Sequence, residues 1–135
     1  MEGPRTPDTF GEQPRLAGTI CNELIVQSFL LNGELVSLVN AVYIKANDSW
    51  HRLVLDAGTI HWGVESNAPL PWAVPENGWS YPHANLGATS GLAGLRILSC
   101  VSRATDVGCT VDFEFEGGRW LYLAESSDEV RYAVT

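Results

Sequence analysis

Apolar and polar residues alternate over residues 39–65, and the rest of the chain can be placed relative to this stretch. β-Branched and aromatic residues fill positions 39–44, residues 46–49 have turn chemistry, and alternation returns at 50–56 and at 59–65. Short alternating runs bounded by Gly, Asn, Asp and Ser are typical of β-strands joined by tight turns. The pattern therefore predicts a β-meander of three strands.

The tight turn at residues 57–58 determines which residues of its two flanking strands face each other. A two-residue turn pairs Leu55 with Ile60, and pairing then continues outward along both strands. The predicted core face carries His51, Leu53, Leu55, Ile60, Trp62 and Val64. The predicted outer face carries Trp50, Arg52, Val54, Asp56, Thr59, His61 and Glu65. His51 and His61 therefore point to opposite sides of the sheet, and we do not expect them to share a metal ion.

Residues 18–31 fit two interpretations. As a strand, the segment ends at Asn32-Gly33, which is a strong signal for a β-hairpin. As a helix, it has Thr19 as the N-cap, apolar residues at helical spacing, and Asn32-Gly33 as the C-cap. Residues 34–42 are ambiguous in the same way. The Val and Ile content of both segments favours strands, with a short helix at 18–31 as the alternative.

Alternation in residues 95–134 predicts further strands, with a tight hairpin turn at Gly117 and Gly118. A two-residue turn at that point pairs Phe113 with Tyr122. The predicted core face is rich in aromatic residues and carries Val111, Phe113, Phe115, Trp120 and Tyr122. The predicted outer face has a carboxylate at every second position beside two leucines, namely Asp112, Glu114, Glu116, Leu121 and Leu123.

Residues 66–95 are rich in Pro and Gly and show no sustained period, so they predict a long irregular loop. Loops longer than about 15 residues are uncommon in compact domains and are often functional. Large aromatic residues in such a loop either pack over the end of a β-structure or line a ligand site, and packing is the commoner outcome. The aromatic and histidine side chains of this segment are Trp72, Trp79, Tyr81 and His83.

Together these hairpins predict an all-β fold, either an antiparallel β-barrel or a β-sandwich, built from hairpins and meanders. Residues 1–15 contain several prolines among polar residues and have no apolar period. This composition predicts a disordered or loosely packed tail. Residues 16–135 are long enough to form one domain with a single hydrophobic core.

The charge balance narrows the range of partners. The formal net charge is -8, and the basic residues are scattered singly, so we expect no binding to nucleic acid or to anionic membranes. The three cysteines match no metal motif, and reduced buried thiols are typical of cytoplasmic proteins. Lys45 is the only lysine in a chain rich in Ala, Gly, Val and Leu, a bias that suggests a GC-rich bacterial genome. The composition therefore predicts a small acidic bacterial protein of the cytoplasm.

No local pattern of catalysis or cofactor binding occurs in the sequence. A nucleophile elbow, a phosphate loop, a dinucleotide fingerprint and a paired-histidine zinc motif are all absent. We therefore predict no catalytic residue, no metal site and no cofactor. Asp56 and His61 share the outer face of the second hairpin, which makes a hydrolase-type enzyme a third hypothesis, although mixed charges on such a face are usually ordinary cross-strand pairs.

The leading hypothesis is a non-catalytic protein-binding domain. Carboxylates on alternate positions of one strand repel each other until a positive group approaches, and adjacent apolar residues supply the patch that interfaces need. An acidic inhibitor or immunity-type protein that holds a basic partner has this character. The predicted partner-binding residues are Asp112, Glu114, Glu116, Leu121 and Leu123. The alternative is a binder of a small molecule or carbohydrate that uses the aromatic loop at 72–83, with Trp72, Trp79, Tyr81 and His83 as the ligand-binding residues.

Overall fold

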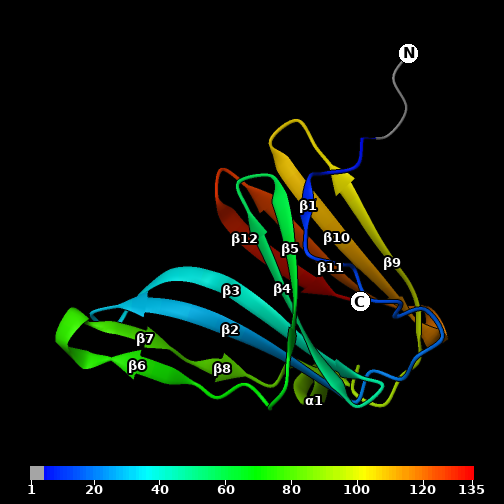
Figure 1. Ribbon diagram of the computed structural model, residues 1–135, viewed down its shortest axis with the longest axis horizontal. Coiled ribbons are helices and arrows are strands. Elements are labelled where there is room, and N and C mark those ends of the chain that lie inside the picture. Colours follow the sequence, from blue (N-terminus) through cyan, green and yellow to red (C-terminus); the bar gives the residue numbers. More distant parts are fainter. Residues whose placement is uncertain (1–4) are drawn as a thin grey trace.

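The computed structural model describes residues 5–135, which form two β-sheets packed against each other (Figure 1). The larger sheet has eight strands in the order β1-β5-β4-β3-β2-β7-β6, with β8 also paired to β2. Its strands are β1 (Thr9–Phe10), β2 (Glu23–Leu31), β3 (Glu34–Ala46), β4 (Ser49–Asp56), β5 (Thr59–Glu65), β6 (Trp72–Val74), β7 (Trp79–Tyr81) and β8 (His83–Ala84). The smaller sheet has the order β12-β11-β10-β9 and is formed by β9 (Ile97–Ala104), β10 (Gly108–Phe115), β11 (Arg119–Ser126) and β12 (Glu129–Val134). The prediction of an all-β fold is confirmed, and the two facing sheets make it sandwich-like.

The hydrophobic core lies between the two sheets. Its largest fully buried side chains include Phe113 and Phe115 from β10 and Leu53 and Ile60 from β4 and β5. The cysteines are free thiols, and burial raises the pKa of Cys21 to about 12, so that thiol stays protonated. None of the helices formed by residues 5–135 has the length and apolar character needed to cross a membrane.

The predicted meander is present, with the predicted pairing at its second turn. Leu55 pairs with Ile60 across β4 and β5, and Ala57 and Gly58 form the turn with positive φ values of 47° and 81°. The core face is buried as predicted except at its last pair, where His51 is half-buried and Val64 is 71% exposed. Alternation determines which face a side chain occupies, but it does not determine how far the opposite sheet extends to cover that face.

The outer face of the meander is less polar than predicted at one end. Trp50 is only 5% exposed, because it packs in a small second cluster with Ala41 and Tyr43 of β3. Ile25 of β2 and Val54 of β4 pack against this cluster. The two histidines do lie on opposite sides of the sheet, as the register requires.

Residues 23–31 are strand β2, so the alternative of a helix at 18–31 is wrong. The turn at Asn32-Gly33 has positive φ at both residues, 50° and 82°, which is the conformation that a two-residue hairpin turn needs. β2 lies inside the larger sheet, with β3 on one side and β7 and β8 on the other. Pairing on both sides outweighs the helical spacing of its apolar residues.

The N-terminal segment contacts both sheets. Residues 1–4 of the predicted tail lie outside the described residues. In the rest of that segment, β1 pairs in parallel with β5, and the backbone carbonyl of Arg5 accepts a hydrogen bond from the N–H of Ala104 in β9. Gly11 allows the N-terminal segment to approach β5 closely, because a Cβ at this position would lie 2.1 Å from the carbonyl oxygen of Trp62.

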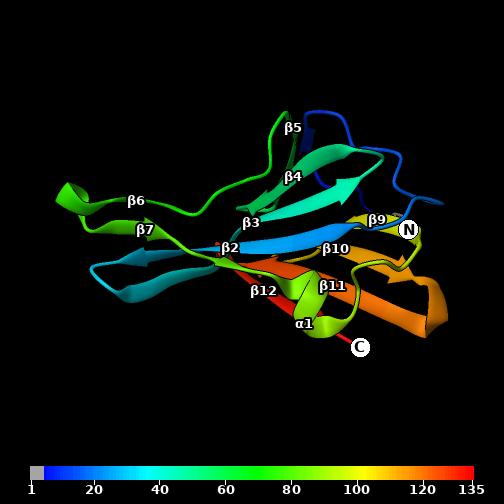
Figure 2. The ribbon, with the colours of Figure 1, turned by 90° about the horizontal axis from the view of Figure 1, so that it is seen from below.

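Residues 66–95 contain short elements where a long irregular loop was predicted. A hairpin of β6 and β7 encloses the 3-10 turn η1 (Pro75–Asn77), and the helix α1 (Leu86–Ser90) follows β8. These elements are too short to show a period in the sequence. Figures 1 and 2 show β6 and β7 lying along the tips of β2 and β3, and together they project beyond the smaller sheet as an arm.

The turn between β10 and β11 is one residue longer than predicted. It contains the 3-10 turn η2 (Glu116–Gly118), so Phe115 pairs with Arg119, and Phe113 pairs with Leu121. The predicted pairing of Phe113 with Tyr122 is wrong. Because side chains alternate between faces, a slip of one residue moves every side chain of β11 to the other face.

Candidate functional site

Two carboxylates and two aromatic rings meet on the outer face of the smaller sheet. Asp112 of β10 lies opposite Tyr122 of β11, and Glu114 lies opposite Trp120. The two rings are stacked, with their centroids 5.6 Å apart and their planes within 4° of parallel. We call these four residues the acidic–aromatic face: Asp112, Glu114, Trp120 and Tyr122.

Apolar residues of the neighbouring edge strand extend the acidic–aromatic face. Val101 of β9 pairs with Asp112 on the side away from Tyr122. Its side chain is 39% exposed, and Leu98 of the same strand is 46% exposed. The carboxylates of β10 therefore lie between an aromatic strip on β11 and an aliphatic strip on β9. Aromatic residues are enriched in protein interfaces, and the carboxylates beside them offer a contact for a basic side chain.

The two carboxylates of the acidic–aromatic face have weak partners within residues 5–135. Burial raises the pKa of Asp112, and the positive charge of Arg103 offsets this only in part. Glu114 accepts a long hydrogen bond of 3.5 Å from the hydroxyl of Ser99. Neither carboxylate forms an ion pair within the described part of the chain. A cation brought by a partner would favour their ionised form.

The prediction that Leu121 and Leu123 lie beside the carboxylates on the surface is wrong. Both leucines are 0% exposed and belong to the core between the sheets. Trp120 and Tyr122 take their place on the outer face, and no sequence signal distinguishes the two registers, because a turn containing two glycines can have either length. Glu116 lies in η2, where its carboxylate accepts a hydrogen bond of 3.0 Å from the N–H of Arg96.

The aromatic residues of segment 66–95 lie on the arm. Trp72 is 50% exposed and Trp79 is 40% exposed. Tyr81 stacks on Trp72 at a centroid distance of 4.0 Å and on Phe29 of β2 at 5.0 Å. The stacked rings therefore attach β6 and β7 to β2, and the exposed parts of Trp72 and Trp79 are the aromatic surface that remains for contact with a ligand.

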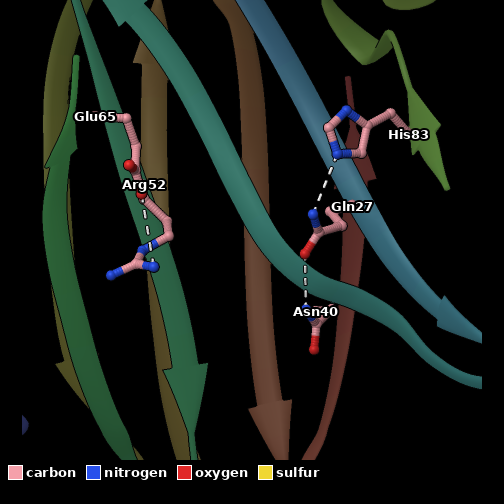
Figure 3. A network of polar contacts seen from close by, with 5 residues as sticks. All are labelled: Gln27, Asn40, Arg52, Glu65 and His83. Carbon is pink, nitrogen blue, oxygen red and sulfur yellow. Dashed lines mark hydrogen bonds and ion pairs between the residues drawn. The ribbon is translucent and has the colours of Figure 1, made fainter. Parts of the chain in front are cut away.

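His83 belongs to a hydrogen-bonded network inside the sheet rather than to an open site (Figure 3). Its Nε2 lies 3.1 Å from the side-chain nitrogen of Gln27, and the Gln27 oxygen accepts a hydrogen bond of 2.8 Å from Asn40. Gln27 is only 4% exposed, so its amide has to be satisfied by these partners. Burial lowers the pKa of His83, which favours the neutral ring in this network. Figure 3 shows the ion pair of Arg52 with Glu65 further along the same surface, at 3.6 Å.

Asp56 and His61 each have another nearest partner. His61 stacks on Phe10 at 4.9 Å, and its Nε2 lies 2.9 Å from the hydroxyl of Thr59. Asp56 instead lies beside Asp128 in the turn between β11 and β12. No hydrogen bond joins Asp56 to His61 among residues 5–135, although His61 lies close enough to lower the pKa of Asp56 in part.

The carboxyl groups of Asp56 and Asp128 interact unfavourably when both are ionised. The pKa of Asp56 is raised by a hydrogen bond with Asp128, by partial burial, and by the negative charges of Asp128 and Glu125, and His61 lowers it only in part. A carboxyl whose pKa is raised in the folded state favours folding at low pH and loses that contribution as the pH rises. Repulsion between the ionised carboxylates therefore lowers the stability of the native state at neutral pH.

We expect Asp128→Asn to raise the melting temperature at about pH 7, by roughly 1–2 °C because the groups are exposed. The gain should shrink as the pH falls through the raised pKa of Asp56, because the protonated carboxyl no longer repels its neighbours. Asn tolerates the positive φ of 65° at this position. Glu76→Gln, an equal charge change in the exposed turn η1, is the control. A melting temperature at neutral pH no higher than that of the control contradicts the expected repulsion.

Glu125 is a buried carboxylate that joins the turns of both sheets. It is 3% exposed and accepts hydrogen bonds from the N–H of Gly58 at 2.5 Å and the N–H of Asp128 at 3.0 Å. The first of these belongs to the turn of β4 and β5, and the second to the turn of β11 and β12. Gly108 leaves room for it, because a Cβ there would lie 2.7 Å from a carboxylate oxygen of Glu125. Nothing in the sequence distinguishes this glutamate from the exposed ones.

Comparison with known proteins assigns no family. No family model, no curated protein and no solved structure matches this chain. Residues 5–135 also contain no group of three His, Cys, Asp or Glu side chains able to hold a metal ion.

Proposed function

We propose that this chain is a non-catalytic binding protein that holds a basic partner protein on its acidic–aromatic face. The observation that carries the proposal is the pairing of two carboxylates, which have no ion-pair partner among the described residues, with two stacked aromatic rings on an uncovered sheet face. Such a face offers both electrostatic attraction and a site of apolar contact.

Charge supports a basic partner. The net charge of -8 attracts a positively charged surface at long range and raises the rate of encounter. At contact, Lys or Arg side chains of the partner neutralise Asp112 and Glu114. Trp120 and Tyr122 offer rings on which an Arg can stack, and aromatic residues commonly carry much of the binding energy of an interface. This combination suits an inhibitor or immunity-type protein.

The double variant Asp112→Lys/Glu114→Lys should lose the partner, with an affinity reduced roughly 100-fold or more, because attraction becomes repulsion at the centre of the contact. Its melting temperature should stay within a few degrees of the wild type, since both side chains lie on the outer face. The measurement is affinity capture from a lysate of the source organism, read by quantitative mass spectrometry, with calorimetry for stability.

Glu12→Lys/Glu76→Lys is the matched control for this experiment, because it changes the net charge equally at two exposed residues outside the acidic–aromatic face. We expect this control to retain most of the captured partner. Equal capture by the wild type and by Asp112→Lys/Glu114→Lys contradicts the proposal. Equal losses in both double variants indicate an effect of net charge alone and contradict it too.

A further inference from the structure

Strand β12 has a free edge. It pairs with β11 on one side only, and Trp120 and Thr135 exchange both of their backbone hydrogen bonds. Because hydrogen-bonded and non-hydrogen-bonded pairs alternate along an antiparallel ladder, the N–H and C=O groups of Val130, Tyr132 and Val134 point away from β11. They have no backbone partner among residues 5–135.

The other ends of the sheets are covered or short. The edge of β9 is covered by the N-terminal segment, with hydrogen bonds from Ala104 to Arg5, from Gly18 to Ile97 and from Ile97 to Thr19. The edge strands of the larger sheet, β1 and β6, have only two and three residues. Six-residue β12 is therefore an edge whose outward-facing backbone groups have no backbone partner among residues 5–135.

A groove runs along this free edge, between β12 and β3. It has a volume of about 370 Å³ and is lined by residues 35–38 and 129–132. The groove exists because β4 pairs with β3 only from Val42 onward, which leaves the preceding part of β3 uncovered on that side. Its apolar wall is exposed, with Leu35 at 57%, Val36 at 56% and Leu38 at 42%.

The groove continues into a second hollow that ends at two carboxylates. The two hollows share Val36, Ser37 and Val130, and the second also contains Asp56 and Asp128. Those two carboxyl groups lie together, and neither has an ion pair among the described residues. The groove therefore has an apolar wall, an unpaired strand edge and a negatively charged end.

We infer that this groove binds an extended peptide segment that adds a strand to β12, with apolar side chains against Leu35, Val36 and Leu38 and a Lys or Arg between Asp56 and Asp128. Strand addition supplies backbone hydrogen bonds, and pockets for alternate side chains supply specificity. The basic residue is required because it removes the repulsion between two carboxylates. The groove shares no residue with the acidic–aromatic face, so the inference does not rest on the proposed function.

The test begins with an array of randomised peptides of about eight residues, probed with the labelled full-length protein. We expect the bound peptides to be enriched in alternating apolar residues with a Lys or Arg near one end. No binding, or binding without this enrichment, overturns the inference. Sedimentation of the protein alone should show a monomer. A dimer that is lost when Val130 or Tyr132 is changed would assign the edge of β12 to a second copy of the chain, and it would overturn the inference as well.

The strongest peptide is then measured by fluorescence anisotropy against variants. Asp56→Asn/Asp128→Asn should weaken binding by at least about tenfold, while Glu76→Gln and Asp112→Lys/Glu114→Lys leave it unchanged. Two N-methylated forms of the peptide, one methylated at the odd-numbered amides and one at the even-numbered amides, should differ in binding. One form should lose binding and the other should keep it, because only every second amide faces β12. Equal affinities of the two N-methylated forms, or an unchanged affinity for the Asp56→Asn/Asp128→Asn variant, overturn strand addition beside the carboxylates.

Discussion

Replacing Leu123 by Ala should lower the free energy of unfolding by about 2–5 kcal/mol, whereas replacing the adjacent Tyr122 by Ala should lower it by about 1 kcal/mol or less. Leu123 is 0% exposed in the core between the two sheets, so its truncation leaves a cavity. Tyr122 is 36% exposed on the outer face, where its main contact is the stacked ring of Trp120. The contrast follows from the three-residue turn before β11.

Urea unfolding of both variants measures this difference directly. The two residues are neighbours on one strand, and their side chains occupy opposite faces of the sheet. A larger loss of stability for Tyr122→Ala than for Leu123→Ala contradicts the register of β11. Such a result would indicate that Leu121 and Leu123 lie on the outer face beside Asp112 and Glu114.

Glu125→Ala should lower the free energy of unfolding by about 2–4 kcal/mol, because it leaves two part-buried backbone donors without an acceptor. The N–H groups of Gly58 and Asp128 both lose their carboxylate partner. These donors belong to turns of the two different sheets, so the substitution also removes a link between the sheets. Urea unfolding is again the measurement.

Two further variants separate this effect from the loss of a negative charge. Glu125→Gln keeps one acceptor oxygen and should lie between the wild type and Glu125→Ala. Glu129→Ala removes an exposed carboxylate whose one ion pair among residues 5–135 is with Arg131, and it should change stability by less than about 0.5 kcal/mol. Equal effects of Glu125→Ala and Glu129→Ala contradict the role assigned to the buried carboxylate.

The two hairpins with glycine turns show how far the sequence predicts register. At 57–58 only one glycine is present, Ala57 accepts a positive φ of 47°, and the two-residue turn and the pairs around it are confirmed. At Gly117 and Gly118 either loop length is sterically open, because glycine adopts positive φ freely. In the longer loop, Leu121 and Leu123 lie in the core with Phe113 and Phe115, and this packing, which involves both sheets, stabilises the longer loop.

The one-residue difference in the register of β11 also explains which residues of the candidate site could be predicted. Asp112 and Glu114 lie on the outer face in either register, because they precede the turn and alternate with Phe113 and Phe115 on β10. The residues beside them follow the turn, so the leucines were predicted there and the aromatic rings were not. Glu125 could not be recognised either, since its burial depends on where separate turns meet.

Short elements were beyond the reach of sequence patterns for another reason. Strands of two or three residues, such as β6, β7 and β8, contain too few positions to show alternation. β2 is long enough, but its apolar residues fit both a helix and a strand, and only its partners on either side decide between them. The fold class could be predicted because most of the other strands are long enough to show a period.

The most direct test of the central claim is the salt dependence of the affinity between this protein and its captured partner. Isothermal calorimetry at about 50 mM and about 500 mM salt, with the wild type and with Asp112→Asn/Glu114→Gln, measures the electrostatic contribution of the acidic–aromatic face. We predict that the wild-type Kd rises roughly tenfold or more with salt and that the neutral variant binds weakly at both concentrations. A Kd that is unchanged by salt and by the substitutions would contradict the account.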